Sequence, residues 1–333
     1  MKSTYLGELQ LQVQVKTPSR LHLGLLDLDG GLGRVFGSIG IGVNYPNVIL
    51  TMNRSKRLVV HGDGSAICKQ FITRLRKKYD IKENVTLNLK HKIPEHVGLG
   101  SITQITLAVA TSFAKIFHIK ATINDLALVM TRGSVSGIGT AIFQHGGLVI
   151  DGGKKIGKGK YTIKPNIPPI LFHHDFPEDW MFVVAIPDVK RGFTDKEEAH
   201  VFKRLPPMPP SDVGRICRLI LMRLLPSLME NDIENFGDAL TRIQSIVGKN
   251  FSPIQGGTYS SIEVKKCIES MTRLGAYGVG QSSWGPTSYG LVKGKRQAKS
   301  VQSSLQTLLD ERVGGQVFIV KADNKGAQIR ISK

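Results

Sequence analysis

Residues 94–104 constrain the fold more than any other segment of this chain. They read Pro-Glu-His-Val-Gly-Leu-Gly-Ser-Ile-Thr-Gln and lie between a strand pattern at 85–89 and an apolar helix pattern at 103–118. Gly98 and Gly100 permit a positive φ and a close approach of the backbone to a ligand. The backbone N–H groups that open the following helix attract anions. The segment is therefore predicted to be a phosphate-binding loop; an ordinary turn with a serine cap is the alternative.

Helix and strand patterns are interleaved in both halves of the chain. Apolar residues recur at helical spacing in the segments 65–78, 124–131, 212–225, 233–247 and 263–274. Strand patterns occur at 9–17, 47–60, 180–186, 317–321 and 328–331, and the glycine-rich segment 30–42 is predicted to be irregular. This mixture predicts an α/β or α+β protein with two lobes, residues 1–160 and 161–333, that meet in a basic loop.

The excess of positive charge indicates an anionic partner. The 333 residues carry a formal net charge of +19, spread over several segments with few aromatic residues beside them. Proteins that bind single-stranded nucleic acid usually place aromatic side chains beside a basic groove. Charge alone leaves a nucleic acid, an acidic surface and a polyphosphorylated metabolite open.

The cysteines and the apolar segments indicate the cellular compartment of the protein. Cys68, Cys217 and Cys267 lie far apart, without the spacing of a disulfide framework or a zinc site. Such sparse cysteines are typical of a reducing cytosol, so a cytoplasmic protein is expected. No apolar run reaches the length of a membrane span, and the first residues alternate like a strand and do not resemble a signal peptide.

A second motif, Ser19–Asp27, contains Arg20 and His22. Side chains two residues apart leave a strand on the same face, so this pair is predicted to meet a phosphate or a carboxylate. Two solvent-exposed side chains are the alternative. Asp27 is expected either to contact ribose hydroxyls or a metal ion, or to cap the glycine turn that follows.

A third motif, Arg132–Ala141, is followed by His145 and two glycines. Arg132 can hold a phosphate or a carboxylate with two parallel hydrogen bonds, and a charge that faces water at a helix end is the alternative. His145 is the acid–base candidate because imidazole titrates near neutral pH, although a lone histidine is often structural.

A fourth motif, Gly275–Pro286, is rich in glycine and in hydrogen-bond donors. It is predicted to be another tight loop beside the bound anion. Trp284 within it is expected to be a core or lobe-interface residue more often than a stacking surface.

Together these motifs resemble the GHMP superfamily, which includes galactokinase, homoserine kinase and mevalonate kinase. Residues 94–101 are similar to its phosphate-binding motif, and the pattern over residues 15–290 is similar to archaeal β-ribofuranosylaminobenzene 5′-phosphate synthases, a branch that is not a kinase. The resemblance implies an α+β, two-lobe GHMP-kinase-like fold. Its N-terminal lobe is expected to be ribosomal protein S5 domain 2-like and its C-terminal lobe ferredoxin-like.

The resemblance also implies a reaction. That family condenses phosphoribosyl pyrophosphate with 4-aminobenzoate or 4-hydroxybenzoate in methanopterin-type cofactor biosynthesis, and it releases pyrophosphate and CO₂. Kinases of the superfamily carry a catalytic Asp four residues before a Ser, where Arg132 stands relative to Ser136. Arginine cannot serve as a base at neutral pH, so anion binding is predicted there in place of proton abstraction. A GHMP-type ATP-dependent small-molecule kinase and an RNA-binding module are the alternatives.

The site expected from these motifs has two groups of residues. The catalytic candidates are Arg20, Arg132 and His145. The candidates for substrate and phosphate binding are His22, Asp27, Gly98, Leu99, Gly100, Ser101, Thr103, Gln104, Ser136, Gly139, Thr140, Gly280, Gln281 and Ser282.

The expected ligands complete this picture. Mg²⁺ is expected with the diphosphate, with Ser101 or Asp27 as the candidate contact, and no redox cofactor is expected. The partner is expected to be a small phosphorylated substrate and not a membrane or a nucleic acid. A homodimer is compatible with the pattern.

Overall fold

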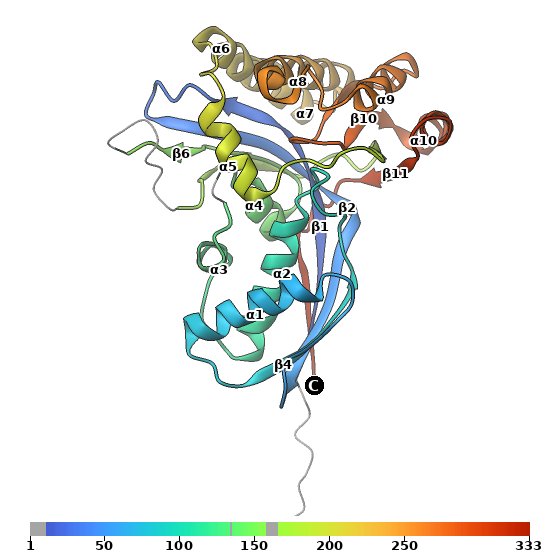
Figure 1. Cartoon of the computed structure of the whole chain (residues 1–333). Coiled ribbons are helices and arrows are strands. Elements are labelled where there is room, and N and C mark those ends of the chain that lie inside the picture. The colour runs from blue at the N-terminus through green and yellow to red at the C-terminus, as the bar shows by residue number, and fades with distance from the viewer. Residues whose placement is uncertain (1–10, 134, 158–165) are drawn as a thin grey trace, which may run out of the picture.

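The computed structural model describes residues 11–133, 135–157 and 166–333, which form two lobes (Figure 1). The strands are β1 (Gln12–Asp27), β2 (Arg34–Ser55), β3 (Val59–His61), β4 (Asn84–His91), β5 (Leu148–Asp151), β6 (Lys154–Lys155), β7 (Ile170–His174), β8 (Trp180–Pro187), β9 (Gly278–Gln281), β10 (Ser288–Lys293), β11 (Gly315–Lys321) and β12 (Gln328–Ser332). The helices are α1 (Ser65–Tyr79), α2 (Ser101–Ile116), α3 (Ile123–Val129), α4 (Ile138–His145), α5 (Asp195–Arg204), α6 (Pro210–Leu219), the π-helical turn η1 (Ile220–Leu224), α7 (Leu225–Met229), α8 (Ile233–Gln255), α9 (Ile262–Arg273) and α10 (Gly294–Asp310).

An eight-stranded sheet forms the first lobe. Its strands lie in the order β12-β1-β2-β4-β3, while β5 and β6 also pair with β2, and β7 pairs with β5. β1 and β2 form a long antiparallel ribbon whose register runs from Gln12 opposite Asn53 to Asp27 opposite Phe36. Helix α2 lies against this ribbon, and α1 packs against α2 and β3 (Figure 1).

The division into lobes differs from the one expected at residue 160. β7 and β12 come later in the chain, yet both belong to the sheet of the first lobe. The first lobe is therefore built from two separate parts of the chain. The expected boundary itself, between residues 160 and 161, lies outside the described residues.

The second lobe has a four-stranded antiparallel sheet in the order β11-β8-β10-β9. Along the chain, β8 is followed by helices, then by β9 and β10, then by α10 and β11. This order of elements is the ferredoxin-like arrangement that the resemblance implied. None of the helices in the described part of the chain is long and apolar enough to cross a membrane.

β8 separates two layers of the core in the second lobe. All of its residues are buried. Phe182 and Val184 belong to the main core cluster, which reaches into the first lobe, whereas Met181 and Val183 pack in a second cluster with α9 and α10. A strand covered on both faces reads as a continuous apolar run, because successive side chains point to opposite faces. The strand predicted from that run is confirmed.

The predicted helices are confirmed with shifts at their ends, and one is divided. The helix expected at 124–131 begins after the Thr122 cap, whose hydroxyl accepts from the Asp125 N–H. The helix expected at 212–225 is divided into α6, η1 and α7. Helix α10 was not predicted, although its buried residues follow helical spacing at Ala298, Val301, Leu305 and Leu309.

The prediction that residues 30–42 are irregular is wrong for most of the segment. β2 begins at Arg34 and carries glycines through its first half. A Cβ on Gly40 would lie 2.2 Å from Cγ2 of Ile138 in α4. The glycine therefore allows a helix to approach the strand closely, which a sequence pattern cannot distinguish from a turn.

Helix α8 lies against β9 through a contact that admits no side chain at Gly237. A Cβ there would lie 2.1 Å from the Tyr277 carbonyl oxygen. Gly237→Ala is therefore expected to lower the free energy of unfolding by about 1–3 kcal/mol, the usual cost of overpacking, as measured by urea denaturation. Gly214→Ala in α6 is the control, since nothing lies within 4 Å of its added Cβ. Alanine forms helix better than glycine, so Gly214→Ala should raise the free energy of unfolding by about 0.5–1 kcal/mol. Equal effects of the two substitutions would contradict the close contact at Gly237.

Candidate active site

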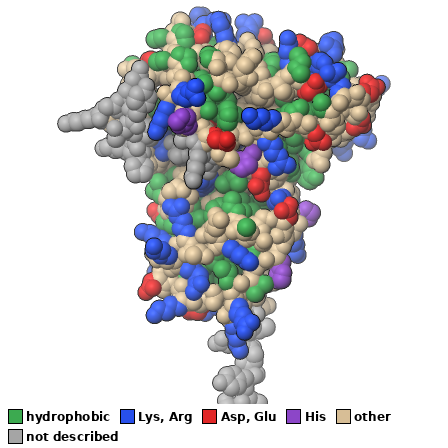
Figure 2. Space-filling model, viewed as in Figure 1, with side chains coloured by type: hydrophobic (Ala, Val, Ile, Leu, Met, Phe, Trp, Pro, Cys, Tyr) green, Lys and Arg blue, Asp and Glu red, His purple; other side chains and the backbone are tan. Residues whose placement is uncertain are grey.

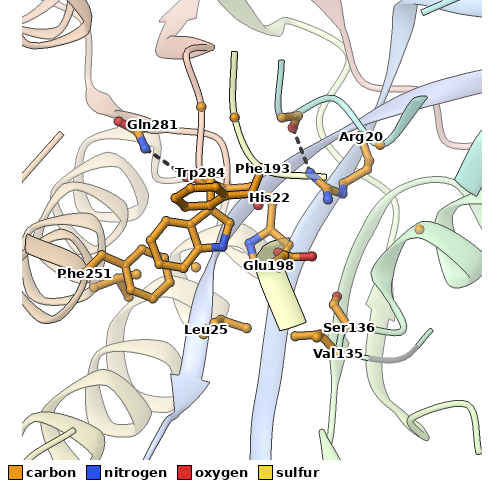
Figure 3. Close-up of a pocket in the computed structure, with 18 of the residues that line it drawn as sticks. Arg20, His22, Leu25, Val135, Ser136, Phe193, Glu198, Phe251, Gln281 and Trp284 are labelled. Atoms are coloured by element: carbon orange, nitrogen blue, oxygen red, sulfur yellow. Dashed lines mark hydrogen bonds between the residues drawn. The ribbon is translucent and has the colours of Figure 1, made fainter. Parts of the chain in front are cut away.

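A cavity between the lobes brings together parts of all four motifs (Figure 3). Its walls come from β1, from the loops that precede α2 and α4, from the loop that follows β9, and from α5 and α8. Ten of the predicted site residues line it: Arg20, His22, Gly98, Gly100, Ser101, Thr103, Arg132, Ser136, Gly139 and Gln281.

The loop before α2 has the geometry of an anion site. Gly98 and Gly100 adopt φ values of 94° and 75°. Gly100 is the N-cap of α2, and no side chain caps the helix. Ser101 and Thr103 in the first turn face the same cavity. The N–H groups of this turn, together with two hydroxyls, are therefore available to a bound anion.

Arg20 is fixed against this loop. Its Nη1 donates to the Gly98 carbonyl at 2.8 Å, and its backbone N–H donates to the Leu99 carbonyl at 3.1 Å. Loss of hydration lowers the pKa of Arg20 to about 10, while the charge of Glu198 acts in the opposite direction. The guanidinium therefore stays positive at neutral pH and points at the cavity with its geometry set in advance.

His22 joins β1 to two loops. Its backbone N–H donates to Oγ of Ser282 at 2.9 Å, and that hydroxyl donates to the Gly98 carbonyl at 2.7 Å. The imidazole is buried, and the loss of hydration lowers its pKa well below 6.5. The positive charge of Arg20 lowers this pKa further. His22 is therefore neutral at physiological pH, with one ring nitrogen able to accept a hydrogen bond.

Arg132 and Ser136 line the cavity from the segment between α3 and α4. Arg132 follows α3 and is half-buried, so it is not simply a charge in water. Behind Ser136, the buried carboxylate of Asp151 accepts from the Gly137 N–H at 2.8 Å and from the Ser136 hydroxyl at 3.4 Å. Asp151 therefore positions the start of α4, where Ser136 and Gly139 line the cavity. Ser134 of this motif lies outside the described residues.

Seven predicted residues do not line the cavity: Asp27, Leu99, Gln104, Thr140, His145, Gly280 and Ser282. Asp27 caps the glycine turn, because its Oδ1 accepts from the N–H groups of Asp29 at 2.6 Å and Gly30 at 2.8 Å. His145 points to the ring of His173, at a centroid distance of 5.4 Å. Sequence spacing does not reveal that α4 directs this histidine away from the cavity.

Several residues of the cavity were not predicted. Glu198 and Phe202 come from α5, a polar helix without a recognisable motif, and Phe193 precedes it. Phe251 comes from the C-terminal part of α8, which extends beyond the predicted helix. Trp284 was expected in the core or at the lobe interface, and it is 6% exposed while also lining the cavity. These residues all come from the part of the chain between β8 and β10, and they meet although they lie far apart in the sequence.

The acidic residues do not gather into a metal site. In the described ranges, no group of three or more His, Cys, Asp or Glu side chains is arranged to hold a metal ion. Of the described residues that line the cavity, Glu198 is the acidic one. A divalent ion here would therefore take most of its ligands from a bound phosphate and from water.

The lobes and the loops define a protein of the GHMP class. Residues 66–147 match the GHMP kinases N terminal domain, and residues 224–311 match the GHMP kinases C terminal model. The chain is 34% identical to the Beta-ribofuranosylphenol 5'-phosphate synthase of Archaeoglobus fulgidus over 96% of this chain and 100% of that protein. It is 33% identical to the Methanothermobacter thermautotrophicus protein of the same name, over 95% of this chain and 98% of that protein. The chain belongs to this family of beta-ribofuranosylphenol 5'-phosphate synthases within the GHMP superfamily.

Solved structures confirm the fold class. Homoserine kinase from Cytophaga hutchinsonii superposes with a TM-score of 0.67 at 15% identity, over 98% of this chain and 99% of that chain. The Methanococcus jannaschii mevalonate kinase superposes with a TM-score of 0.65 at 15% identity, over 93% and 98%. At such low identity the similarity shows the α+β, two-lobe fold and nothing about the reaction.

Asp151 should give the protein a measurable dependence of stability on pH. Burial raises its pKa from 3.8 to about 6, although the N–H groups of Gly153 and Gly137 act against this shift. The folded state therefore holds a proton that the unfolded chain releases, and stability present below pH 4 is lost as the pH rises to about 6. The loss should amount to about 3 kcal/mol.

Asp151→Asn should flatten this part of the pH profile. The measurement is urea denaturation at a series of pH values between 4 and 7, with Asp310→Asn as the control for the loss of an exposed carboxylate. Identical pH profiles for the wild type and Asp151→Asn would show that the carboxylate is not buried as described.

Proposed function

We propose that the protein joins C1 of phosphoribosyl pyrophosphate to the ring of a para-substituted benzoate and releases pyrophosphate and CO₂. The proposal rests on the similarity to the beta-ribofuranosylphenol 5'-phosphate synthases over nearly the whole chain. That name describes a ribofuranosyl phosphate joined to a phenol, which favours 4-hydroxybenzoate over 4-aminobenzoate as the acceptor. The product would be a precursor of a methanopterin-type cofactor.

The cavity suits a substrate with several negative charges. Arg20, Arg132 and the first turn of α2 converge on it from separate elements. Guanidinium groups bind phosphates with paired hydrogen bonds, and helix N-termini add N–H donors. These donors are held in place before the substrate binds, so they can stabilise the charge that develops on the leaving diphosphate without first reorganising.

The reaction needs no nucleophile from the protein. The C1–oxygen bond to diphosphate breaks, and the ring carbon that bears the carboxylate attacks C1. The para hydroxyl supplies electron density to that carbon, and loss of CO₂ then restores the aromatic ring. The protein's task is to position both substrates and to neutralise the diphosphate. The Glu198 carboxylate in the same cavity offers an acceptor to ribose hydroxyls.

Mg²⁺ would accompany the diphosphate and neutralise part of its charge. Mg²⁺ at phosphate sites is usually held by one or two carboxylates together with substrate oxygens. Glu198 and the Ser101 hydroxyl, both in the cavity lining, fit that donor set. Asp27 fits it less well, because one of its carboxylate oxygens already accepts two N–H groups of its own turn.

The surface charge supports a small anionic substrate more than a nucleic acid. On the face seen in Figure 2, Lys and Arg side chains are scattered over both lobes and form no continuous stripe.

The free cysteines agree with a reducing cytoplasm.

Incubation with phosphoribosyl pyrophosphate, Mg²⁺ and 4-hydroxybenzoate should release pyrophosphate and CO₂ in equal amounts. The measurement is an enzyme-coupled assay for pyrophosphate together with ¹⁴CO₂ from carboxyl-labelled acceptor, and 4-aminobenzoate is the comparison acceptor. Release with neither acceptor would refute the proposal. ATP-dependent phosphorylation of a small alcohol instead would establish the kinase alternative.

Arg132→Ala should lower turnover by roughly 10²–10³-fold, the usual effect of removing one preorganised donor from a developing negative charge. The half-buried position of Arg132 predicts a folded variant, to be checked by circular dichroism. Arg296→Ala, at an exposed position in α10, is the control for loss of one positive charge. Wild-type kinetics in Arg132→Ala would mean that the anion binds elsewhere.

A further inference from the structure

One wall of the cavity is built of aromatic rings. Trp284 and Phe251 stack with their ring centroids 4.0 Å apart and an angle of 12° between the ring planes. Phe193 and Phe202 meet Trp284 edge-on, at 5.3 and 5.7 Å. All four line the same cavity as Arg20. In Figure 3, Trp284, Phe251 and Phe193 lie together on one side, Arg20 lies on the other, and His22 lies between them.

The aromatic residues of this wall come from separate elements of the fold. Phe251 comes from α8, Trp284 from the loop after β9, and Phe202 from α5. Leu25 of β1 adds a further apolar surface. Phe251 and Trp284 are 5% and 6% exposed, and they form part of the cavity wall.

The two sides of the cavity favour different chemistry. The charged groups of a phosphorylated sugar would lose hydration against the aromatic rings without gaining partners, which is unfavourable. They find such partners at Arg20 and at the first turn of α2. A flat, largely apolar ring gains contact area and favourable stacked or edge-on geometry at the aromatic wall.

We propose that Trp284, Phe251, Phe193 and Phe202 form the subsite for the aromatic ring of the acceptor. The inference rests on the proposed function, which supplies an aromatic acid as the second substrate. A ring on this wall faces the phosphate-binding side across the cavity, with His22 between them. A reaction between a ring carbon and C1 of a sugar phosphate requires both substrates to be bound next to each other, and the two sides belong to one cavity.

The tryptophans of this chain allow a direct test of binding. Trp180 and Trp284 are its two tryptophans, and Trp180 is buried in the core against Phe176 and Phe236. Trp180→Phe therefore leaves Trp284 as the fluorescent reporter, and Trp284→Phe leaves Trp180. The titrant is 4-hydroxybenzoate, with Mg²⁺ and pyrophosphate present to fill the polar side.

We expect a saturable change of emission in Trp180→Phe and none in Trp284→Phe. Benzoate without a para substituent should give the same change, because ring contact and not reactivity produces it. A change confined to adenosine or ATP would overturn the proposal and identify the wall as a purine site. Equal changes in the two variants would overturn it as well.

Kinetics provide a second, independent readout. Phe251→Leu should raise the KM for 4-hydroxybenzoate roughly two- to tenfold, the loss expected for one aromatic contact, and leave the KM for phosphoribosyl pyrophosphate unchanged. Phe117→Leu, which removes a ring packed on Phe113 outside the cavity lining, is the matched control.

The outcomes separate this inference from the proposed function. Ring binding at Trp284 without any turnover would remove the proposed reaction and keep the subsite. In another outcome, turnover is normal while the emission of Trp284 does not change and Phe251→Leu leaves the KM for 4-hydroxybenzoate unchanged. That result would keep the reaction and overturn the subsite. Neither turnover nor binding would overturn both.

Discussion

The geometry of the site depends on the hydroxyl group of Ser282, which is hydrogen-bonded to two other segments of the chain. Ser282 accepts the N–H of His22 and donates to the carbonyl of Gly98, so β1 and the loops that precede α2 and follow β9 share a single buried contact. The packing at this point is tight, because a Cβ on Gly98 would lie 2.2 Å from the Ser282 carbonyl oxygen. The geometry of the anion loop is therefore fixed by the second lobe as much as by its own glycines.

The groups around Arg20 explain how positive charge is tolerated between the lobes. Arg20 gives one hydrogen bond to Gly98 and is balanced by the charge of Glu198, so its partial burial does not neutralise it. His22 next to it is kept neutral and adds no further repulsion. Under the proposed function, a phosphate would meet groups whose charges and positions are already set, which is the preorganisation that stabilises developing charge in enzymes.

The sequence predicted those site residues whose pattern lies within one short segment of the chain, and missed those that packing brings together. The loop before α2 was recognisable because its glycines and the helix after it are neighbours in the chain. Arg20 and His22 were recognisable from the two-residue period of one strand. Glu198 and Phe251 were not, because only the packing of distant segments brings them to the cavity. His145 does not line the cavity, because the direction of α4 places its ring beside that of His173, which the sequence of the glycine-rich segment does not reveal.

The pairing of β12 with β1 has a consequence for how the protein is made. Residues 328–332 complete the sheet edge that begins at residue 12, with Gln12 opposite Ser332 and Lys16 opposite Gln328. While the chain is still emerging from the ribosome, the outer edge of β1 has no partner, although domains near the N-terminus generally fold first. An open strand edge is a template for unwanted pairing with other chains. The edge of β1 therefore stays open to such pairing until β12 has been synthesised and can dock on it.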